Sequence, residues 1–218
     1  MADLARAIGA ECDRLGLGIH PESFQRLAAY AASLWLWNER LNLTRHTDVE
    51  KFVSRDVADA AAIALQLARG ERVLDVGTGG GVPGALLAIL RPDLRVELCD
   101  SVAKKARAVR EIVHEAGLSL PVHGAAGQAV VTAAAARGER FDTLVVRAVA
   151  PLVKLLSWFE PLAGDFGRLF VVKGPRWEEE KGEARHKGFA KKVMVRRIAA
   201  WPIRGSDNES VLLEIRPR

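Results

Sequence analysis

The feature that most constrains the fold is a run of glycines between an apolar segment and a helical one. Residues 72–76 read Arg-Val-Leu-Asp-Val, and residues 77–84 read Gly-Thr-Gly-Gly-Gly-Val-Pro-Gly. Glycine lets the backbone turn sharply and lets a ligand approach it closely, and the following helix presents free N–H groups. A strand, a glycine loop and a helix in this order predict a nucleotide-type cofactor site at the end of the strand.

Two acidic residues flank this loop. Asp100 follows the next predicted strand, about 20 residues beyond the glycines, where a carboxylate can accept hydrogen bonds from both ribose hydroxyls of an adenosine. Asp75 lies two residues before the first glycine and would suit the ammonium group of a methionine moiety. For Asp75 the alternative, a buried acid that only binds loop N–H groups, stays open.

Strands alternate with helices from residue 71 onward, which predicts a parallel sheet. The five strands are expected at 72–76, 95–99, 120–123, 141–146 and 168–173. The helices between them are expected from Pro83 onward, and at 102–116, 128–136 and 150–159. Two further strands, 192–200 and 210–216, are joined by turn-forming residues that include Ser206, and they predict an antiparallel pair that closes the sheet.

The residues before this alternation show helical periodicity and no strand pattern. Helices are expected from Leu4 to Leu15, from Pro21 to Leu41, and from Val49 to Leu67. We therefore expect a single domain over 1–218, in which 1–68 form an N-terminal helical extension and 69–218 form the α/β core.

Composition limits the other classes. The chain has a net charge of +5, compatible with a polyanionic partner, but the basic residues between Lys173 and Arg197 are mixed with four glutamates. That segment fits an RNA-facing surface and an ion-paired solvated helix equally well. Cys12 and Cys99 have no CxxC spacing and are expected to be reduced and cytoplasmic, the histidines have no ligand spacing for a metal, and no apolar run approaches the roughly 20 residues of a membrane span.

The loop and Asp100 fit both a nicotinamide cofactor and S-adenosylmethionine, so an NAD-dependent oxidoreductase is a rival interpretation. The acid before the glycines and the antiparallel terminal pair favour S-adenosylmethionine. The predicted fold is an α/β, Rossmann-like class I methyltransferase fold, with a seven-stranded, mostly parallel sheet, an antiparallel terminal strand and N-terminal helices before it.

Several short motifs carry a family resemblance. They are Trp37-Asn38, Asn42-Leu43-Thr44, the glycine loop ending in Pro-Gly, Asp100-Ser101, Arg147-Ala148-Val149-Ala150 and Lys173-Gly174. In this combination the sequence resembles the RsmG (GidB) family of bacterial 16S rRNA guanine-N7 methyltransferases over nearly its whole length. The resemblance implies S-adenosyl-L-methionine as cofactor and 16S rRNA or the small ribosomal subunit as partner, and nothing in the pattern requires more than a monomer.

The glycine loop with its flanking acids and the resemblance together give the candidate site residues. The residues expected to hold the cofactor are Asp75, Gly77, Gly79, Gly81, Val82, Asp100, Ser101, Ala126, Gly127 and Arg147. Two segments depart from the family: residues 124–128 read Gly-Ala-Ala-Gly-Gln in place of an R-A-E-like segment, and Arg55-Asp56 stands in place of R-H. These departures keep open a non-catalytic RNA-binding protein that retained the fold.

The chemistry implied by the resemblance needs no general base, because guanine N7 carries an in-plane lone pair and no proton. Arg147, after the fourth strand, is expected to position the base, with a structural ion pair as the alternative. Lys173 is a second candidate for contact with base or phosphate, with an ordinary surface lysine as the alternative. The residues expected to contact RNA are Asn42, Arg45 and Arg55, with helix capping as the alternative for Asn42, and Trp177 is the best candidate for base stacking.

Overall fold

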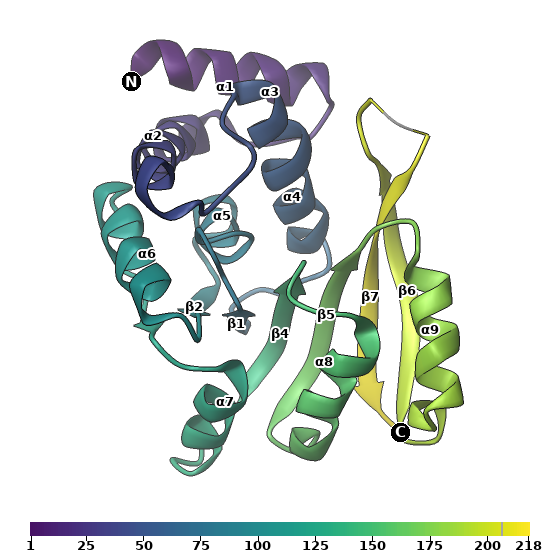
Figure 1. The fold of residues 1–218 in the computed structure, drawn as a ribbon. Coiled ribbons are helices and arrows are strands. Elements are labelled where there is room, and N and C mark those ends of the chain that lie inside the picture. The colour runs from purple at the N-terminus through teal and green to yellow at the C-terminus, as the bar shows by residue number, and fades with distance from the viewer. Residues whose placement is uncertain (206) are drawn as a thin grey trace.

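The computed structural model describes residues 1–205 and 207–218. Ser206, which the sequence places between the last two strands, lies outside the described residues. The centre of the molecule is a seven-stranded sheet in the order β3-β2-β1-β4-β5-β7-β6 (Figure 1). The strands are β1 (Arg72–Val76), β2 (Arg95–Cys99), β3 (Val122–His123), β4 (Phe141–Arg147), β5 (Phe166–Lys173), β6 (Val193–Pro202) and β7 (Glu209–Pro217).

The direction of the strands confirms the predicted fold class. β1 pairs in parallel with β2 and β4, and β4 pairs in parallel with β5. β7 lies between β5 and β6 and is antiparallel to both. β1 and β2 have the predicted bounds, and those of β4, β6 and β7 differ from the prediction by one or two residues. β3 begins at Val122 where the sequence placed its start at Leu120, and β5 begins at Phe166 where the sequence placed its start at residue 168. β1 and β4, which lie between β2 and β5 in the sheet, are buried on both faces along most of their length, as is typical of the apolar strands of a parallel sheet.

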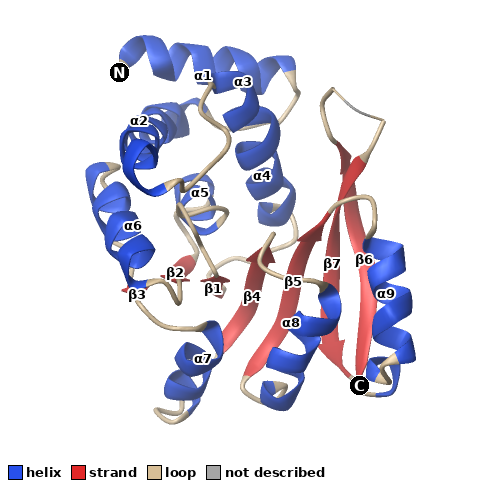
Figure 2. Cartoon of the chain, viewed as in Figure 1, coloured by secondary structure: helices blue, strands red, loops and turns tan. Residues whose placement is uncertain are grey.

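Helices cover both faces of the sheet (Figure 2). Their bounds are α1 (Ala2–Arg14), α2 (Phe24–Leu41), α3 (Val49–Lys51), α4 (Ala58–Ala64), α5 (Gly84–Leu90), α6 (Ala103–Glu115), α7 (Gly127–Ala135), α8 (Leu152–Phe159) and α9 (Trp177–His186). Successive strand residues alternate between two cores: Val73 belongs to the core that includes buried residues of α1, α2, α4, α5 and α6, and Leu74 to the core that includes buried residues of α7, α8 and α9. Among the described residues, no helix is both long enough and apolar enough to cross a membrane.

The N-terminal helices share a core with the sheet. Leu27, Tyr30 and Leu34 of α2 are fully buried in the same cluster as Val73 of β1 and Leu98 of β2. The helical extension expected from the sequence therefore forms much of the cover on one face of the sheet.

The predicted helix 49–67 contains a feature that periodicity did not indicate. A π-helical turn, Phe52–Val57, separates α3 from α4. A π-helical turn widens the backbone, and such turns often occur at functional sites. Here the turn carries Asp56, and Asp59 follows it in the first turn of α4.

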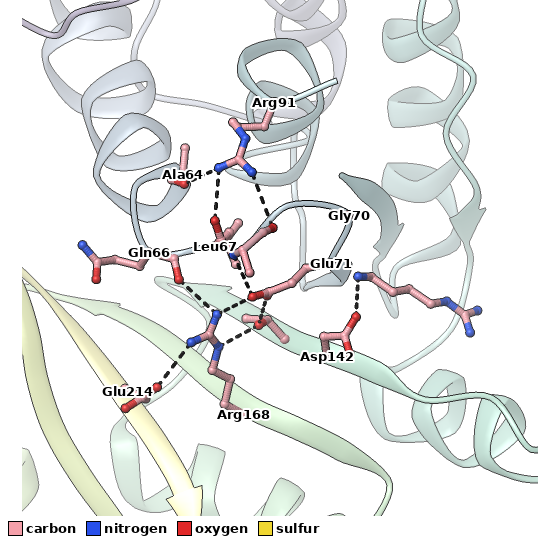
Figure 3. A network of polar contacts seen from close by, with 12 residues as sticks. Ala64, Gln66, Leu67, Gly70, Glu71, Arg91, Asp142, Arg168 and Glu214 are labelled. Carbon is pink, nitrogen blue, oxygen red and sulfur yellow. Dashed lines mark hydrogen bonds and ion pairs between the residues drawn. The ribbon is translucent and has the colours of Figure 1, made fainter. Parts of the chain in front are cut away.

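A polar network joins the helical region to the sheet near the amino ends of its strands (Figure 3). Arg168 of β5 donates to Glu71 Oε1 at 2.7 Å, to the Gln66 carbonyl at 3.0 Å and to Thr143 Oγ1 at 2.9 Å. Its guanidinium also lies 3.5 Å from Glu214 Oε1. We call Gln66, Glu71, Thr143, Arg168 and Glu214 the closed network. Beside it, a second arginine, Arg91, donates to the carbonyl of Ala64, the last residue of α4, and to the carbonyl of Leu67 in the segment that follows.

Candidate cofactor and substrate site

A cavity of about 740 Å³ opens at the carboxyl ends of β1, β2 and β4. Its volume lies within the range of pockets that hold small-molecule ligands, and ligands of open α/β sheets bind at this end of the strands. The residues that line it come from the segment after α2, the π-helical turn, the glycine loop, the ends of β2 and β4, and the first turn of α6: Asn42, Leu43, Thr44, Arg45, His46, Asp56, Gly77, Thr78, Gly79, Gly80, Val82, Asp100, Ser101, Lys105, Arg147, Ala148 and Val149.

The glycine loop is held by backbone bonds to β2 and by a tyrosine from α2. The N–H groups of Gly77 and Thr78 both donate to the Cys99 carbonyl, at 2.9 and 3.0 Å. The buried Tyr30 hydroxyl donates to the Gly80 carbonyl at 2.8 Å. Gly77 has a φ of 71°, and a Cβ there would lie 2.6 Å from the Val149 side chain, so this turn accepts only glycine.

Asp100 is in the position expected of a ribose-binding acid. It lines the cavity, and its Oδ2 accepts the Gly79 N–H at 3.0 Å while its Oδ1 accepts the Val102 N–H at 2.8 Å. A carboxylate oxygen has two lone pairs, so each of these oxygens can accept one more donor. Ser101 lines the cavity beside it.

Asp75 lies differently from the expectation that it meets a ligand's ammonium group. It is outside the cavity lining and 1% exposed. Its Oδ2 accepts the Thr78 hydroxyl at 2.6 Å and the Gly84 N–H at 2.9 Å. Burial raises the pKa of this carboxyl to about 6. The geometry is that of the alternative interpretation, an acid that fixes the two ends of the glycine loop.

Three other residues expected at the cofactor also lie outside the lining. A Cβ on Gly81 would lie 3.1 Å from the Tyr30 hydroxyl, so this glycine faces α2. A Cβ on Gly127 would lie 2.6 Å from the Val76 side chain, which makes it a close contact between α7 and β1. Ala126 precedes α7 and is exposed. The expected residues Gly77, Gly79, Val82, Asp100, Ser101 and Arg147 do line the cavity.

Arg147 ends β4 and lies between two buried aspartates. Its Nη1 is 2.7 Å from Asp56 Oδ1, and its Nε is 2.8 Å from Asp59 Oδ2. Asp56 Oδ1 also pairs with His46 Nδ1 at 2.8 Å, and Asp59 Oδ1 accepts the Trp201 indole N–H at 2.8 Å. Burial raises the pKa of Asp59. We call His46, Asp56, Asp59, Arg147 and Trp201 the open network, because three of its members line the cavity.

The expected RNA contacts divide into two groups. Asn42 and Arg45 line the cavity, whereas Arg55 is half-buried outside it. Asn42 has a φ of 48° and ends α2, with its N–H donating to the Asn38 carbonyl. The expectation that Asn42 caps the following helix is wrong, because Asp48 performs that role through the Lys51 N–H.

Lys173 and Trp177 lie away from the cavity. The Lys173 ammonium donates to the Ala150 carbonyl at 2.8 Å and to Glu180 Oε2 at 2.7 Å, which joins the end of β5 to α9. Trp177 lines a second depression beside β6, with Lys181 and Arg197 over its ring at 5.6 and 5.9 Å.

Sequence reasoning missed Thr78, Gly80, Lys105 and Val149 at the cavity, although each stands within or beside a motif it used. It also assigned no site role to Asp56, whose carboxylate faces Arg147 across 91 positions of sequence. No local pattern indicates such a contact.

Comparison with known proteins identifies close relatives. The family model for rRNA small subunit methyltransferase G matches residues 23–204. A ribosomal RNA small subunit methyltransferase G of Rhodopirellula baltica is 44% identical over 191 residues, covering 88% of this chain and 80% of the relative. The corresponding protein of Escherichia fergusonii is 33% identical over 204 residues, covering 93% of each chain. The crystal structure of a mutant of MtNAS in complex with S-adenosylmethionine superposes with a TM-score of 0.55 at 19% identity, covering 91% of this chain and 79% of that one.

Proposed function

This chain belongs to the rRNA small subunit methyltransferase G (GidB) family, and from that membership we propose that it methylates N7 of one guanine in 16S rRNA, guanine-527 in conventional numbering. Bound S-adenosyl-L-methionine supplies the methyl group. The observation that carries the proposal is the family match together with a cavity in which the glycine loop, Asp100 and Arg147 meet. The proposed partner is the small ribosomal subunit or its RNA in the bacterial cytoplasm.

The residues present fit an adenosyl group. Gly79 lines the cavity, and a Cβ there would meet only the Gly77 carbonyl, at 4.0 Å, so the backbone of the loop is open to a ligand at this position. Asp100 retains lone pairs for two ribose hydroxyls. We therefore propose that Gly77, Gly79 and Val82 hold the adenosyl and methionine parts by their backbone, while Asp100 and Ser101 bind the ribose.

The chain's own task is to orient the base. Guanine N7 offers an in-plane lone pair, so no side chain has to remove a proton before the methyl group moves. Alignment of nucleophile and methyl group can account for several kcal/mol of the barrier. Arg147 is suited to this task because the two aspartates fix its guanidinium at the cavity wall.

The rival oxidoreductase interpretation has no support in the relatives, which are named methyltransferases. The non-catalytic alternative is separated from our proposal by experiment. Purified protein is incubated with labelled S-adenosylmethionine and either 30S subunits or free 16S rRNA that lack the modification, and the labelled base is mapped. Incorporation at N7 of one guanine is expected. Cofactor binding without incorporation into either RNA would instead support the non-catalytic protein.

The cofactor placement has its own test. Asp100→Ala should weaken S-adenosylmethionine binding in calorimetry by about 1–3 kcal/mol, because the ribose hydroxyls lose their acceptor. Asp13→Ala is the matched control, since it removes an exposed carboxylate on α1 outside the cavity lining. Equal affinities of the two variants would refute this placement of the ribose.

A further inference from the structure

Two buried side-chain oxygens have no hydrogen-bond partner among the described residues: Asp56 Oδ2 and Asp75 Oδ1. Asp75 stands behind the glycine loop, outside the cavity lining, whereas Asp56 belongs to that lining. The Asp56 side chain is only 2% exposed. A buried carboxylate oxygen without a donor is costly, and such a group in a native fold calls for an explanation.

The neighbours of Asp56 use only one of its oxygens. Arg147 Nη1 and His46 Nδ1 both contact Oδ1, at 2.7 and 2.8 Å. Arg147 has five N–H donors, and its contacts with the two aspartates involve only Nη1 and Nε at these distances. Arg147, which has unused donors, and Asp56, which has an unused and buried acceptor oxygen, therefore lie side by side among the residues that line the cavity.

This pairing complements one base edge. Guanine carries the O6 acceptor next to the N1–H and N2–H donors on its Watson–Crick edge, and enzymes that act on a base extracted from its stack commonly bind that edge. Adenine presents a donor where guanine has O6 and an acceptor where guanine has N1–H. A guanidinium and a carboxylate side by side thus match guanine and oppose adenine.

We propose that Asp56 is a specificity-determining residue, whose carboxylate accepts the N1–H and N2–H donors of the target guanine while Arg147 donates to O6. The inference rests on the proposed function and names the residue that selects its substrate. It also assigns a use to the oxygen that the protein's own donors leave unpartnered.

The same contact favours the reaction. As the N7–methyl bond forms, the methyl–sulfur bond breaks with its electron pair on sulfur, and the positive charge passes to the guanine ring. No proton leaves the base. A carboxylate at N1–H then faces a base that has become cationic, so the contact is stronger in the transition state than in the ground state.

The test compares two isosteric variants on two substrates. Asp56→Asn replaces an acceptor by an amide, and Asp59→Asn makes the same change at the other aspartate of Arg147, which lies outside the cavity lining. Each protein is assayed on 30S subunits reconstituted with 16S rRNA that carries either guanine or inosine at the target position. Inosine retains N7 and N1–H but lacks the N2 amino group.

The wild-type protein should show kcat/KM about 10- to 100-fold lower on inosine than on guanine, the loss of one charge-assisted hydrogen bond. Asp56→Asn should lose at least about 100-fold on guanine, with a guanine-to-inosine ratio near one and S-adenosylmethionine affinity within about threefold of wild type. Asp59→Asn should retain the wild-type ratio, whatever its rate.

The outcomes separate the two proposals. If the wild-type protein methylates guanine N7 with a guanine-to-inosine ratio near one, Asp56 does not read the base, and this holds even if Asp56→Asn fails to fold. A ratio that Asp56→Asn leaves unchanged overturns the inference in the same way. If the wild-type protein methylates no guanine at N7, the proposed function fails and the inference fails with it.

Discussion

The closed network and the open network are built from the same parts at opposite ends of one sheet. Each sets an arginine of an interior strand, Arg168 or Arg147, between two carboxylates that are distant from that arginine in the sequence. Near the amino ends of the strands, Arg168 is also bonded to a hydroxyl and a carbonyl (Figure 3). At the carboxyl ends, Arg147 and Asp56 line a cavity, and Asp56 keeps an oxygen without a donor.

The difference teaches how to separate a structural ion pair from a functional one. Both arginines are largely buried, so burial and pairing do not distinguish them. What distinguishes them is whether the protein supplies all the hydrogen-bond partners, and whether the residues of the ion pair line a cavity. In an open α/β sheet the carboxyl ends of the strands are where that capacity meets a ligand.

The largest expected effect is at the open network. Arg147→Ala leaves Asp56 and Asp59 as neighbouring buried charges, which should lower the free energy of unfolding by about 3–5 kcal/mol. Turnover of the folded fraction should fall by at least about 100-fold while S-adenosylmethionine affinity changes little, because Arg147 is assigned to the base. Chemical denaturation, calorimetry and single-turnover kinetics measure the three quantities. A loss of affinity with normal turnover would move Arg147 to the cofactor.

The closed network should respond in stability alone. Arg168→Met strands Glu71 and Glu214, whose side chains are somewhat more exposed than the two aspartates, so we expect a loss of about 2–3 kcal/mol. Urea denaturation gives the loss, and affinity and turnover should stay at wild-type values. Arg95→Ala is the control. The Arg95 side chain is 70% exposed and lies 4.0 Å from Asp142, and an exposed ion pair of this kind contributes about 0–1 kcal/mol to stability. A turnover defect in Arg168→Met would erase the distinction between the networks.

A third prediction concerns Asp75, whose Oδ1 is the other buried oxygen without a hydrogen-bond partner among the described residues. The pKa of Asp75 is raised from 3.8 to about 6, so its protonated form is favoured by folding. The stability linked to that proton is fully present below pH 3.8 and is lost as the pH rises through 6. Asp75→Asn removes this loss, so near pH 7 the variant without ligand should be more stable than wild type by roughly 1–3 kcal/mol. Thermal unfolding between pH 4 and pH 8 measures it, and parallel profiles for the two proteins would contradict it.

The smallest effect is expected at the edge of the open network. Trp201→Phe removes the indole donor to Asp59 Oδ1 and retains most of the ring. The loss of this hydrogen bond should cost about 1–2 kcal/mol of stability and little turnover, because Trp201 contacts neither the base nor the cofactor in our proposal. Denaturant unfolding and steady-state kinetics measure both. A turnover loss as large as that of Arg147→Ala would mean that the hairpin of β6 and β7 positions the arginine.

Local sequence patterns predicted most of the fold. β1 and β2 have the predicted bounds, because an apolar run that is followed at once by glycine or aspartate marks clearly where the strand ends. The family resemblance is confirmed by the relatives. The π-helical turn before α4 was not predicted, because its residues have the same apolar spacing as an ordinary helix.

The candidate site was predictable only where a motif carried it. Asp100 and the loop glycines follow from strand–loop–helix order. Asp75 belongs to the same motif, yet its side chain accepts hydrogen bonds from Thr78 and Gly84. The direction of a side chain within a motif is seen only in the three-dimensional structure. The pairing of Asp56 with Arg147 joins the π-helical turn to the end of β4, and such long-range contacts leave no mark in a single sequence.

The position of β7 between β5 and β6 bears on the order in which the molecule can be assembled during translation. The ribosome releases β6 before β7, yet β6 pairs only with β7 within the described sheet. Until residues 209–217 emerge, the outer edge of β5 has no neighbour and β6 has nowhere to attach. An apolar strand edge is thus exposed through the synthesis of more than 30 residues (174–208). We expect this interval to be the one in which the nascent chain most needs protection from aggregation.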